Sequence, residues 1–175
     1  MAKILVVDDE PNMRRILSLI LQEDKHEIIE ADGVKSALNL LSSTFFELVV
    51  TDKKMLDGDG IEIVNYCHEN DPTLPVVMLT AFATVELAVE TMQAGAFDFI
   101  SKPFISEVVK RVAKRATERV KLVRENVLLR EEAKRFAPLF GVKAPEIFNL
   151  SKYQAWVRIG TENTLIETFP PRIPE

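Results

Sequence analysis

Cysteine is almost absent from this sequence, which has one, Cys67, among 175 residues. A disulfide within the chain is therefore excluded. The sequence also lacks any apolar run of about 18 residues, the length that predicts a membrane span. No charged stretch followed by an apolar one marks a leader for export. We therefore expect a cytoplasmic protein that makes no contact with a membrane.

Glycine is scarce as well, with 6 residues, and no Gly-rich or Ser-rich linker divides the chain. Charge divides it instead: residues 1–103 carry 18 acidic and 8 basic side chains, whereas residues 104–135 carry 5 and 10. The length suits one full core with a small extension. We predict three segments, namely a domain at residues 1–120, a long helix at 106–136 that continues from it, and a tail at 137–175.

Short apolar runs alternate with helix-length stretches through the first hundred residues. The expected strands are at residues 3–7, 28–31, 48–51, 76–79 and 97–100. The expected helices are at residues 11–21, 34–41, 61–69 and 85–94. This alternation is typical of an α/β protein with a parallel sheet. Ligands of such sheets gather outside the carboxyl ends of the strands, so those ends are where a site is expected.

Polar side chains follow four of the expected strands. Asp8 and Asp9 follow the first strand, Asp52 the third, Thr80 the fourth and Lys102 the fifth. Carboxylates placed side by side repel one another unless a cation lies among them. Oxygen ligands suit Mg²⁺, and no His or Cys accompanies them at the spacing of a zinc site. A carboxylate beside Mg²⁺ and an ammonium group can accept a phosphoryl group, and Asp52 is the natural candidate because its strand is expected to be central.

Four stretches, "VVDDE", "TDKKMLDGDG", "VVMLTA" and "FDFISKP", occur in this order at the ends of these strands. Together they resemble the receiver domain of two-component response regulators. The resemblance implies a doubly wound, five-stranded parallel sheet of the flavodoxin-like order 2-1-3-4-5. It also implies a regulatory switch, not an enzyme, that a sensor histidine kinase phosphorylates on Asp52. Mg²⁺ would be held by Asp8, Asp9, Asp52 and the backbone carbonyl of Lys54.

The same resemblance assigns further roles around the acceptor. Lys102, Thr80 and the backbone of Ala81 would bind the phosphoryl group, and Pro103 would follow a cis peptide bond. Thr80 and Phe99 would form the switch pair. If Thr80 moves toward a phosphoryl oxygen, an aromatic side chain on the next strand can fill the space that it leaves. That movement would couple the site to the surface formed by the fourth helix, fifth strand and fifth helix.

Several residues depart from the usual pattern of that family. Lys53 stands where an apolar residue is common, and Leu56 stands where proline is common, which would loosen the loop. Lys54 and Phe82, each two residues past Asp52 and Thr80, are expected to shield the acyl phosphate and change its lifetime. The run Asp57 to Gly60 is expected to form a loop and cap the third helix, because the EF-hand pattern of a calcium site is absent.

No proline or glycine interrupts residues 106–136, which therefore predict one long helix. Apolar residues recur there at the spacing of a coiled-coil dimer seam: Ala113, Ala116, Val120, Val123 and Val127. A second seam runs through Leu122, Asn126, Leu129, Ala133 and Phe136. We expect a homodimer, with a change of register between the seams as one way to signal. The alternatives are a helix that packs on its own receiver domain and a helix that is merely solvated.

The stretches "RENVLLREE" and, more faintly, "FGVKAPEIF" resemble nitrogen-regulator-class (sigma-54-dependent) transcription activators after their receiver domain. The phosphate loop of their ATPase and a DNA-reading helix are not found in this sequence. The resemblance implies a link to transcription regulation, without direct contact between this chain and nucleic acid. In the tail, alternating runs at residues 155–159 and 164–169 predict a short hairpin.

Three other functions fit parts of the pattern. A Mg²⁺-dependent phosphohydrolase of the haloacid-dehalogenase type needs a second Asp two residues after the nucleophile, where this chain has Lys54. A second alternative is a dimerising adaptor with an inert acidic pocket. It would be favoured if neither Mg²⁺ nor a phosphodonor affected the protein. Nucleic-acid binding by the basic helix is disfavoured, because Glu residues alternate with its basic ones.

Overall fold

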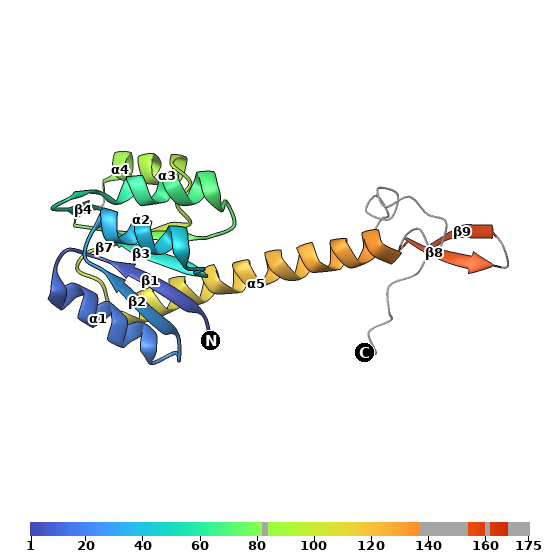
Figure 1. Ribbon diagram of the computed structural model, residues 1–175, viewed down its shortest axis with the longest axis horizontal. Coiled ribbons are helices and arrows are strands. Elements are labelled where there is room, and N and C mark those ends of the chain that lie inside the picture. Colours follow the sequence, from blue (N-terminus) through green and yellow to red (C-terminus); the bar gives the residue numbers. More distant parts are fainter. Residues whose placement is uncertain (82–83, 137–153, 160–161, 168–175) are drawn as a thin grey trace. The chain divides into compact units, whose positions relative to one another are not determined.

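A five-stranded parallel sheet forms the centre of the computed structural model, which describes residues 1–81, 84–136, 154–159 and 162–167 (Figure 1). The strand order is β2-β1-β3-β6-β7. The predicted order 2-1-3-4-5 is therefore confirmed, since β6 and β7 are the fourth and fifth strands of this sheet. The strands are β1 (Lys3–Val7), β2 (Glu27–Ala31), β3 (Leu48–Asp52), β6 (Val76–Thr80) and β7 (Asp98–Ser101).

Helices follow the strands, as the alternation in the sequence predicted. They are α1 (Pro11–Gln22), α2 (Val34–Ser43), α3 (Gly60–Asn70), α4 (Val85–Gln93) and α5 (Ser106–Phe136). Helix α4 begins where the Thr84 hydroxyl accepts a hydrogen bond from the Leu87 N–H at 3.2 Å, and it ends before Gly95, whose φ is 101°. A positive φ is favourable for glycine, which explains the stop at that residue.

The sheet separates two hydrophobic cores because successive side chains of a strand point to opposite faces. In β1, Ile4 and Val6 pack in the core that α1 and α5 cover, whereas Leu5 and Val7 pack in the core that α2 and α3 cover. All four are fully buried. A strand buried on both faces accounts for an apolar run without polar alternation. Such a strand gives the residues at its carboxyl end a rigid support.

Two short strands lie between β3 and α3. They are β4 (Lys54–Met55) and β5 (Gly58–Asp59), which pair antiparallel. In the tail, β8 (Gln154–Ile159) and β9 (Glu162–Glu167) also pair antiparallel, near the runs that predicted a hairpin. The rest of the predicted tail, residues 137–153, 160–161 and 168–175, lies outside the described residues.

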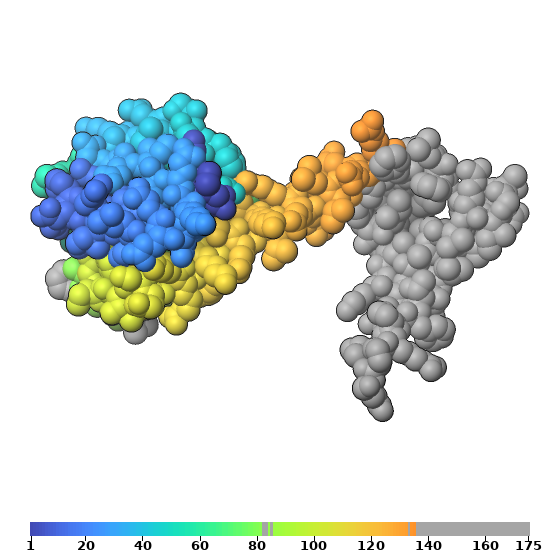
Figure 2. All heavy atoms as spheres, turned by 90° about the horizontal axis from the view of Figure 1, so that it is seen from below, coloured from blue at the N-terminus to red at the C-terminus, as the bar shows by residue number. Residues whose placement is uncertain are grey.

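The chain divides into two compact units, Met1–Val123 and Arg124–Glu175. The first unit contains the sheet, α1 to α4 and the start of α5. In Figure 2 the yellow atoms at the start of α5 lie against the blue atoms of α1, which share a hydrophobic core with them. None of the helices in the described ranges combines the length and the apolar character that a bilayer crossing demands.

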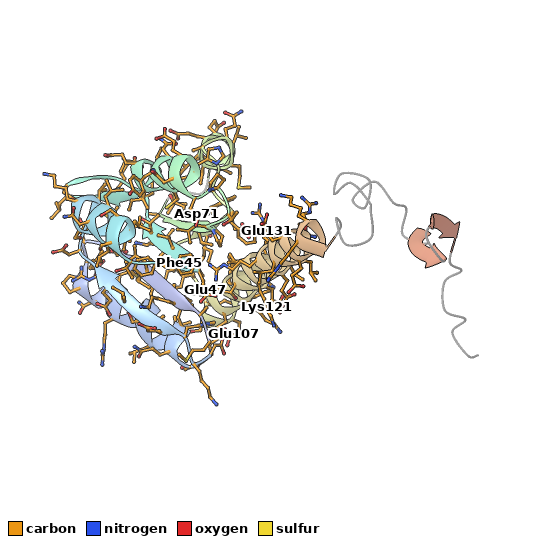
Figure 3. The ribbon with its side chains drawn as sticks, turned by 45° about the vertical axis from the view of Figure 1, so that its right-hand side comes forward. Phe45, Glu47, Asp71, Glu107, Lys121 and Glu131 are labelled. Carbon is orange, nitrogen blue, oxygen red and sulfur yellow. The ribbon has the colours of Figure 1, made fainter. Side chains whose placement is uncertain are left out.

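The start of α5 corrects one prediction. Ala113, Ala116 and Val120, expected to form a dimer seam, are buried within the single chain, with exposed fractions of 3%, 0% and 1%. The prediction that these three residues contribute to an intermolecular seam is therefore wrong, because the first unit already covers them. Val127 is 53% exposed, and the seam through Val123 and Val127 stays a prediction. Charged residues such as Lys121 and Glu131 also lie on the exposed part of α5 (Figure 3).

Candidate functional site

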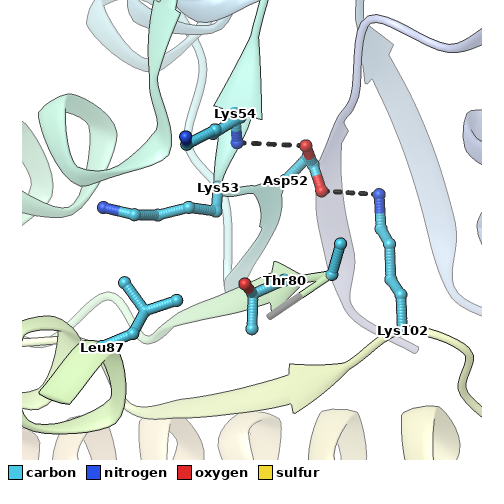
Figure 4. A pocket seen from close by; sticks show the side chains of 7 residues that line it. Asp52, Lys53, Lys54, Thr80, Leu87 and Lys102 are labelled. Carbon is cyan, nitrogen blue, oxygen red and sulfur yellow. Dashed lines mark hydrogen bonds and ion pairs between the residues drawn. The ribbon is translucent and has the colours of Figure 1, made fainter. Parts of the chain in front are cut away.

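The carboxyl ends of β1, β3, β6 and β7 bring together the polar residues predicted there. We call Asp8, Asp9, Asp52, Thr80 and Lys102 the strand-end site. The register places Val7 beside Thr51 and Asp52 beside Leu79, so the residues that end these strands meet at one edge. A cavity of about 490 Å³ opens there (Figure 4). Its lining consists of Asp52, Lys53, Lys54, Thr80, Ala81, Leu87 and Lys102.

An ammonium group joins two of the carboxylates. Lys102 Nζ lies 3.0 Å from Asp8 Oδ2 and 2.5 Å from Asp52 Oδ1. Figure 4 shows the second of these contacts. The Lys102 N–H donates to the Thr80 carbonyl at 2.7 Å, which holds the backbone of the lysine to the neighbouring strand. The peptide bond between Lys102 and Pro103 is cis. In this arrangement, Lys102 is the cation that lies between the carboxylates of Asp8 and Asp52.

The pKa values of Asp52 and Lys102 are both higher than usual, for different reasons. Burial raises the pKa of Asp52, and the hydrogen bond and charge of Lys102 oppose that rise without cancelling it. Burial lowers the pKa of Lys102, but its hydrogen bonds to Asp52 and Asp8 outweigh burial and raise it. Lys102 therefore keeps its positive charge, and Asp52 is a poorly solvated carboxyl group. Such displaced pKa values are typical of functional sites.

Backbone amides donate to one oxygen of each of the three carboxylates. Asp8 Oδ1 accepts a hydrogen bond from the Glu10 N–H at 2.9 Å, and Asp52 Oδ2 accepts one from the Lys54 N–H at 3.1 Å. Asp9 Oδ2 accepts one from the Leu56 N–H at 2.9 Å. Two of these donors belong to the loop that follows β3, so this loop fixes the orientation of both Asp52 and Asp9.

The donor atoms fit a hard divalent cation better than a soft one, because Asp8, Asp9 and Asp52 offer only oxygen. Asp8 and Asp52 direct oxygens at the same ammonium nitrogen, so both can face a shared cation. Asp9 instead faces the Leu56 amide. In the part of the chain that the structure describes, no three acidic, His or Cys side chains are gathered into a metal cluster. The carboxylates are the right type for Mg²⁺, with Lys102 in contact with two of them.

The expected switch residues lie on adjacent strands. Thr80 is 4% exposed and lines the cavity beside Asp52. Phe99 pairs in register with Met78 and is half-buried against the core that α2 and α3 cover. It also lines a second hollow, of about 260 Å³, with Ile105 and Val108 among its neighbours. The rotation of Phe99 stays a prediction, and Phe82 lies outside the described residues.

Two roles were missed from the sequence. Lys53, noted only as a departure, is 9% exposed, and its ammonium pairs with Asp59 at 3.2 Å and with Glu90 at 3.8 Å. Asp59 caps α3, as predicted, and Glu62 completes a capping box with it that was not predicted. Asp57 does not take part in that cap and instead binds the start of α2. No pattern in the sequence indicates that contact, because residues 33 and 57 come together only through the fold.

Comparison with known proteins gives a family match over most of the chain. Residues 4–114 match the family described as the response regulator receiver domain. The response regulator protein PilR of Pseudomonas aeruginosa is 41% identical over 101 residues, which are 58% of this chain and 23% of PilR. The C4-dicarboxylate transport transcriptional regulatory protein DctD of the same species is 34% identical over 128 residues, 73% of this chain and 28% of DctD. The chain spans about a quarter of the length of these relatives.

Solved structures agree with these relatives. NtrX from Brucella abortus, in complex with ADP, superposes with a TM-score of 0.67 at 39% identity, covering 74% of this chain and 29% of NtrX. The beryllofluoride-activated NtrC4 receiver domain dimer superposes with a TM-score of 0.64 at 34% identity, covering 67% of this chain and 98% of that one. The resemblance found in the sequence is therefore confirmed, and the part that matches the family, residues 4–114, lies in the first unit.

Proposed function

The chain belongs to the response regulator receiver domain family, and from that premise we propose that it accepts a phosphoryl group on Asp52 from a sensor histidine kinase. The observation that carries the proposal is the contact of one ammonium, that of Lys102, with both Asp8 and Asp52 at the mouth of the cavity. A phosphoryl group that arrives at Asp52 brings negative charge, which a fixed cation stabilises in a poorly solvated site.

The proposed transfer moves one group between two nucleophiles. An oxygen of the Asp52 carboxylate forms a bond to phosphorus while the bond between phosphorus and the kinase imidazole nitrogen breaks. That nitrogen keeps the electron pair, and the product is an acyl phosphate on Asp52. Lys102 neutralises a phosphoryl oxygen, and the Thr80 hydroxyl and the backbone of Ala81 donate hydrogen bonds to others. Positioning and charge neutralisation suffice for this kind of reaction.

Mg²⁺ is proposed as the cofactor, held by Asp8, Asp9, Asp52 and the backbone carbonyl of Lys54. When bound, it supplies positive charge to the phosphoryl oxygens. The support is the all-oxygen donor set and the exposed position of the loop that carries Lys54. In this proposal Lys102 stays next to Asp52 after phosphorylation. Its ammonium exchanges its contact with Asp8 for a contact with a phosphoryl oxygen.

The proposed output is a change of surface, not turnover of a substrate. Movement of Thr80 toward the phosphoryl group lets Phe99 turn inward, which alters the face made by α4, β7 and α5. The seam through half-buried Val123 and exposed Val127 then pairs with a second copy of the chain. PilR and DctD are named as regulators, DctD as a transcriptional one, which supports a role in transcription regulation. Lys54, where a phosphohydrolase needs an acid, disfavours the enzymatic alternative.

The test is intact mass and light scattering on the same sample, before and after incubation with Mg²⁺ and a small acyl phosphate. The wild-type protein should gain the mass of one phosphoryl group, and Asp52→Asn should gain none. A chelator should prevent the gain. An unmodified wild-type protein would contradict the proposal and favour an adaptor with an inert pocket. A dimer that forms equally in the Asp52→Asn variant would separate dimerisation from phosphorylation.

A further inference from the structure

Helix α2 begins without a cap of its own and is capped by a distant residue. Its N-cap residue is Gly33, which has no side chain to accept a hydrogen bond. Asp57 Oδ1 accepts from the Val34 N–H at 2.9 Å, and Asp57 Oδ2 accepts from the Lys35 N–H at 3.0 Å. The first N–H groups of a helix have no partner within it, and a carboxylate there is also favoured by the helix dipole. Asp57 thus ties the loop after β3 to the start of α2.

Gly33 is shaped to receive that carboxylate. A Cβ atom at Gly33 would lie 2.4 Å from Asp57 Oδ1 and 2.7 Å from Asp57 Cγ, far inside contact distance. The φ of Gly33 is 173°, an extended conformation that any residue adopts. Backbone strain therefore does not require glycine here. Glycine is required here because a larger residue would occupy the space of the Asp57 side chain.

The loop that Asp57 anchors is the loop that orients the strand-end site. The Lys54 N–H donates to Asp52, and the Leu56 N–H, immediately before Asp57, donates to Asp9. The antiparallel pairing of β4 with β5 joins Lys54 to Asp59 and Met55 to Gly58, so Leu56 and Asp57 form the turn between the two short strands. Leu56 stands where proline is common in the family, and proline would have no N–H to give to Asp9. The two amides and the Asp57 anchor lie within four consecutive residues.

We propose that Asp57 is a positioning residue for phosphoryl transfer, because it fixes the loop whose amides orient Asp52 and Asp9. The part that concerns transfer rests on the proposed function. The part that concerns the loop rests only on the contacts between Asp57 and α2. The side-chain hydrogen bonds of Asp57 in the described part of the chain go to the Val34 and Lys35 amides and not to Asp52 or Asp9, so its effect passes through the backbone from residue 54 to residue 57.

The first experiment compares Asp57→Ala and Asp57→Asn with Ser36→Ala. Ser36 also bonds at the start of α2, to Asp32 and to the Gly33 carbonyl, and within the described residues none of these hydrogen bonds reaches the loop. The readouts are hydrogen exchange of the Lys54 and Leu56 amides by NMR, and the rate constant of phosphorylation by a small acyl phosphate with Mg²⁺. Asp57→Ala should raise the exchange of these amides about tenfold. Its phosphorylation rate constant should fall by about three- to tenfold, because small displacements of reacting groups are costly.

Asp57→Asn keeps one acceptor oxygen and should show the same changes to a smaller extent. Ser36→Ala should change both readouts by less than about twofold, although it too weakens the start of α2. An effect of Ser36→Ala as large as that of Asp57→Ala would overturn the proposal, since loss of stability in α2 alone would then explain it. Unchanged amide exchange in Asp57→Ala would overturn it as well.

The second experiment approaches the contact from Gly33. Gly33→Ala should displace the Asp57 carboxylate and reproduce the changes seen in Asp57→Ala. In the Asp57→Ala background, Gly33→Ala should have no further effect, because the clash is gone. Additive effects would contradict the proposed fit between the two residues. A wild-type protein that gains no phosphoryl group would defeat the proposed function, and the role of Asp57 in transfer with it. A wild-type adduct with a normal rate in Asp57→Ala would defeat only the role of Asp57.

Discussion

The strand-end site and the exposed stretch of α5 depart from ordinary burial in opposite directions. At the site, Asp8 and Asp52 are buried, with exposed fractions of 1% and 8%. Along α5, Leu122, Leu128 and Leu129 are exposed by 64% or more. Buried charges and grouped exposed apolar residues are the two kinds of departure that carry information. Neither is explained by stability, so each indicates a function.

The two regions differ in what stabilises them. Charges at the site are held by Lys102 and by backbone amides, and removing one partner leaves the others buried and unpaired. The apolar residues of the exposed α5 stretch are already in water, so their replacement costs little folding free energy. We therefore expect mutations at the site to affect both stability and chemistry. Mutations in exposed α5 should affect association alone.

The largest effect on stability is expected for Lys102→Met. This change leaves two buried carboxylates without their common cation, which should lower the free energy of unfolding by about 3 kcal/mol. Urea unfolding at neutral pH measures it. Lys110→Met is the matched control, because the ammonium of Lys110 pairs with exposed Glu23. If Lys110→Met lowered the free energy of unfolding as much as Lys102→Met does, the claim that the buried carboxylates depend on Lys102 would be contradicted.

The next effect separates the two parts of α5. Ala116 is fully buried, so Ala116→Leu overpacks the core and should lower the free energy of unfolding by about 2 kcal/mol. Leu129→Ala lies on the exposed part of the same helix and should change it by less than about 0.5 kcal/mol. Thermal and urea unfolding measure both variants. Equal losses would show that the two parts of α5 are not buried differently.

A smaller effect is expected from Asp52→Asn, with the opposite sign. Because the pKa of Asp52 is raised by burial, the folded protein binds this proton more tightly than the unfolded chain does. Its contribution to stability is therefore lost as the pH rises from the ordinary value of 3.8 through the raised one. Asp52→Asn should be more stable than the wild type at neutral pH, because the amide carries no charge that burial penalises. This difference in the free energy of unfolding should disappear below pH 3.8, the ordinary pKa of an aspartate, as urea unfolding at several pH values would show. A variant that is less stable than the wild type at neutral pH would contradict the raised pKa of Asp52.

The smallest effect on stability, and the clearest on association, is expected for Val127→Gln. Val127 lies on the exposed part of the predicted seam, so its change should weaken a dimer while leaving the unfolding free energy within about 0.5 kcal/mol. Light scattering of the phosphorylated protein measures the association. Leu128→Gln, on neither seam, is the control and should leave the dimer intact. If Leu129→Gln weakens the dimer and Val127→Gln does not, the second seam is the one in use.

Much of the first unit could be predicted from the sequence because its signals are local. The apolar run before Asp8 indicated a strand buried on both faces, and the residues after each strand indicated where a site lies. The carboxyl ends of parallel strands must share an edge, so Asp52 and Lys102 could be brought together without coordinates. Their contact in the structure agrees with that reasoning.

The failures have a common cause. The spacing of Ala113, Ala116 and Val120 is the same whether a helix packs on its own domain or on a second copy, so periodicity alone could not choose. In the structure, Ala113 and Ala116 pack in the hydrophobic core between the sheet and α5. Asp57 was assigned to the wrong helix because two helix starts lie within its reach, and only the fold decides between them.

Locating the acyl phosphate tests the account most directly. The wild-type protein, treated with Mg²⁺ and a small acyl phosphate, is reduced with borohydride and digested, and the peptides are mapped by mass. Borohydride converts an aspartyl phosphate to homoserine, so the account predicts homoserine at Asp52 and unmodified Asp8 and Asp9. Homoserine at Asp8 or Asp9, or at no residue, would contradict the claim that Asp52 accepts the phosphoryl group.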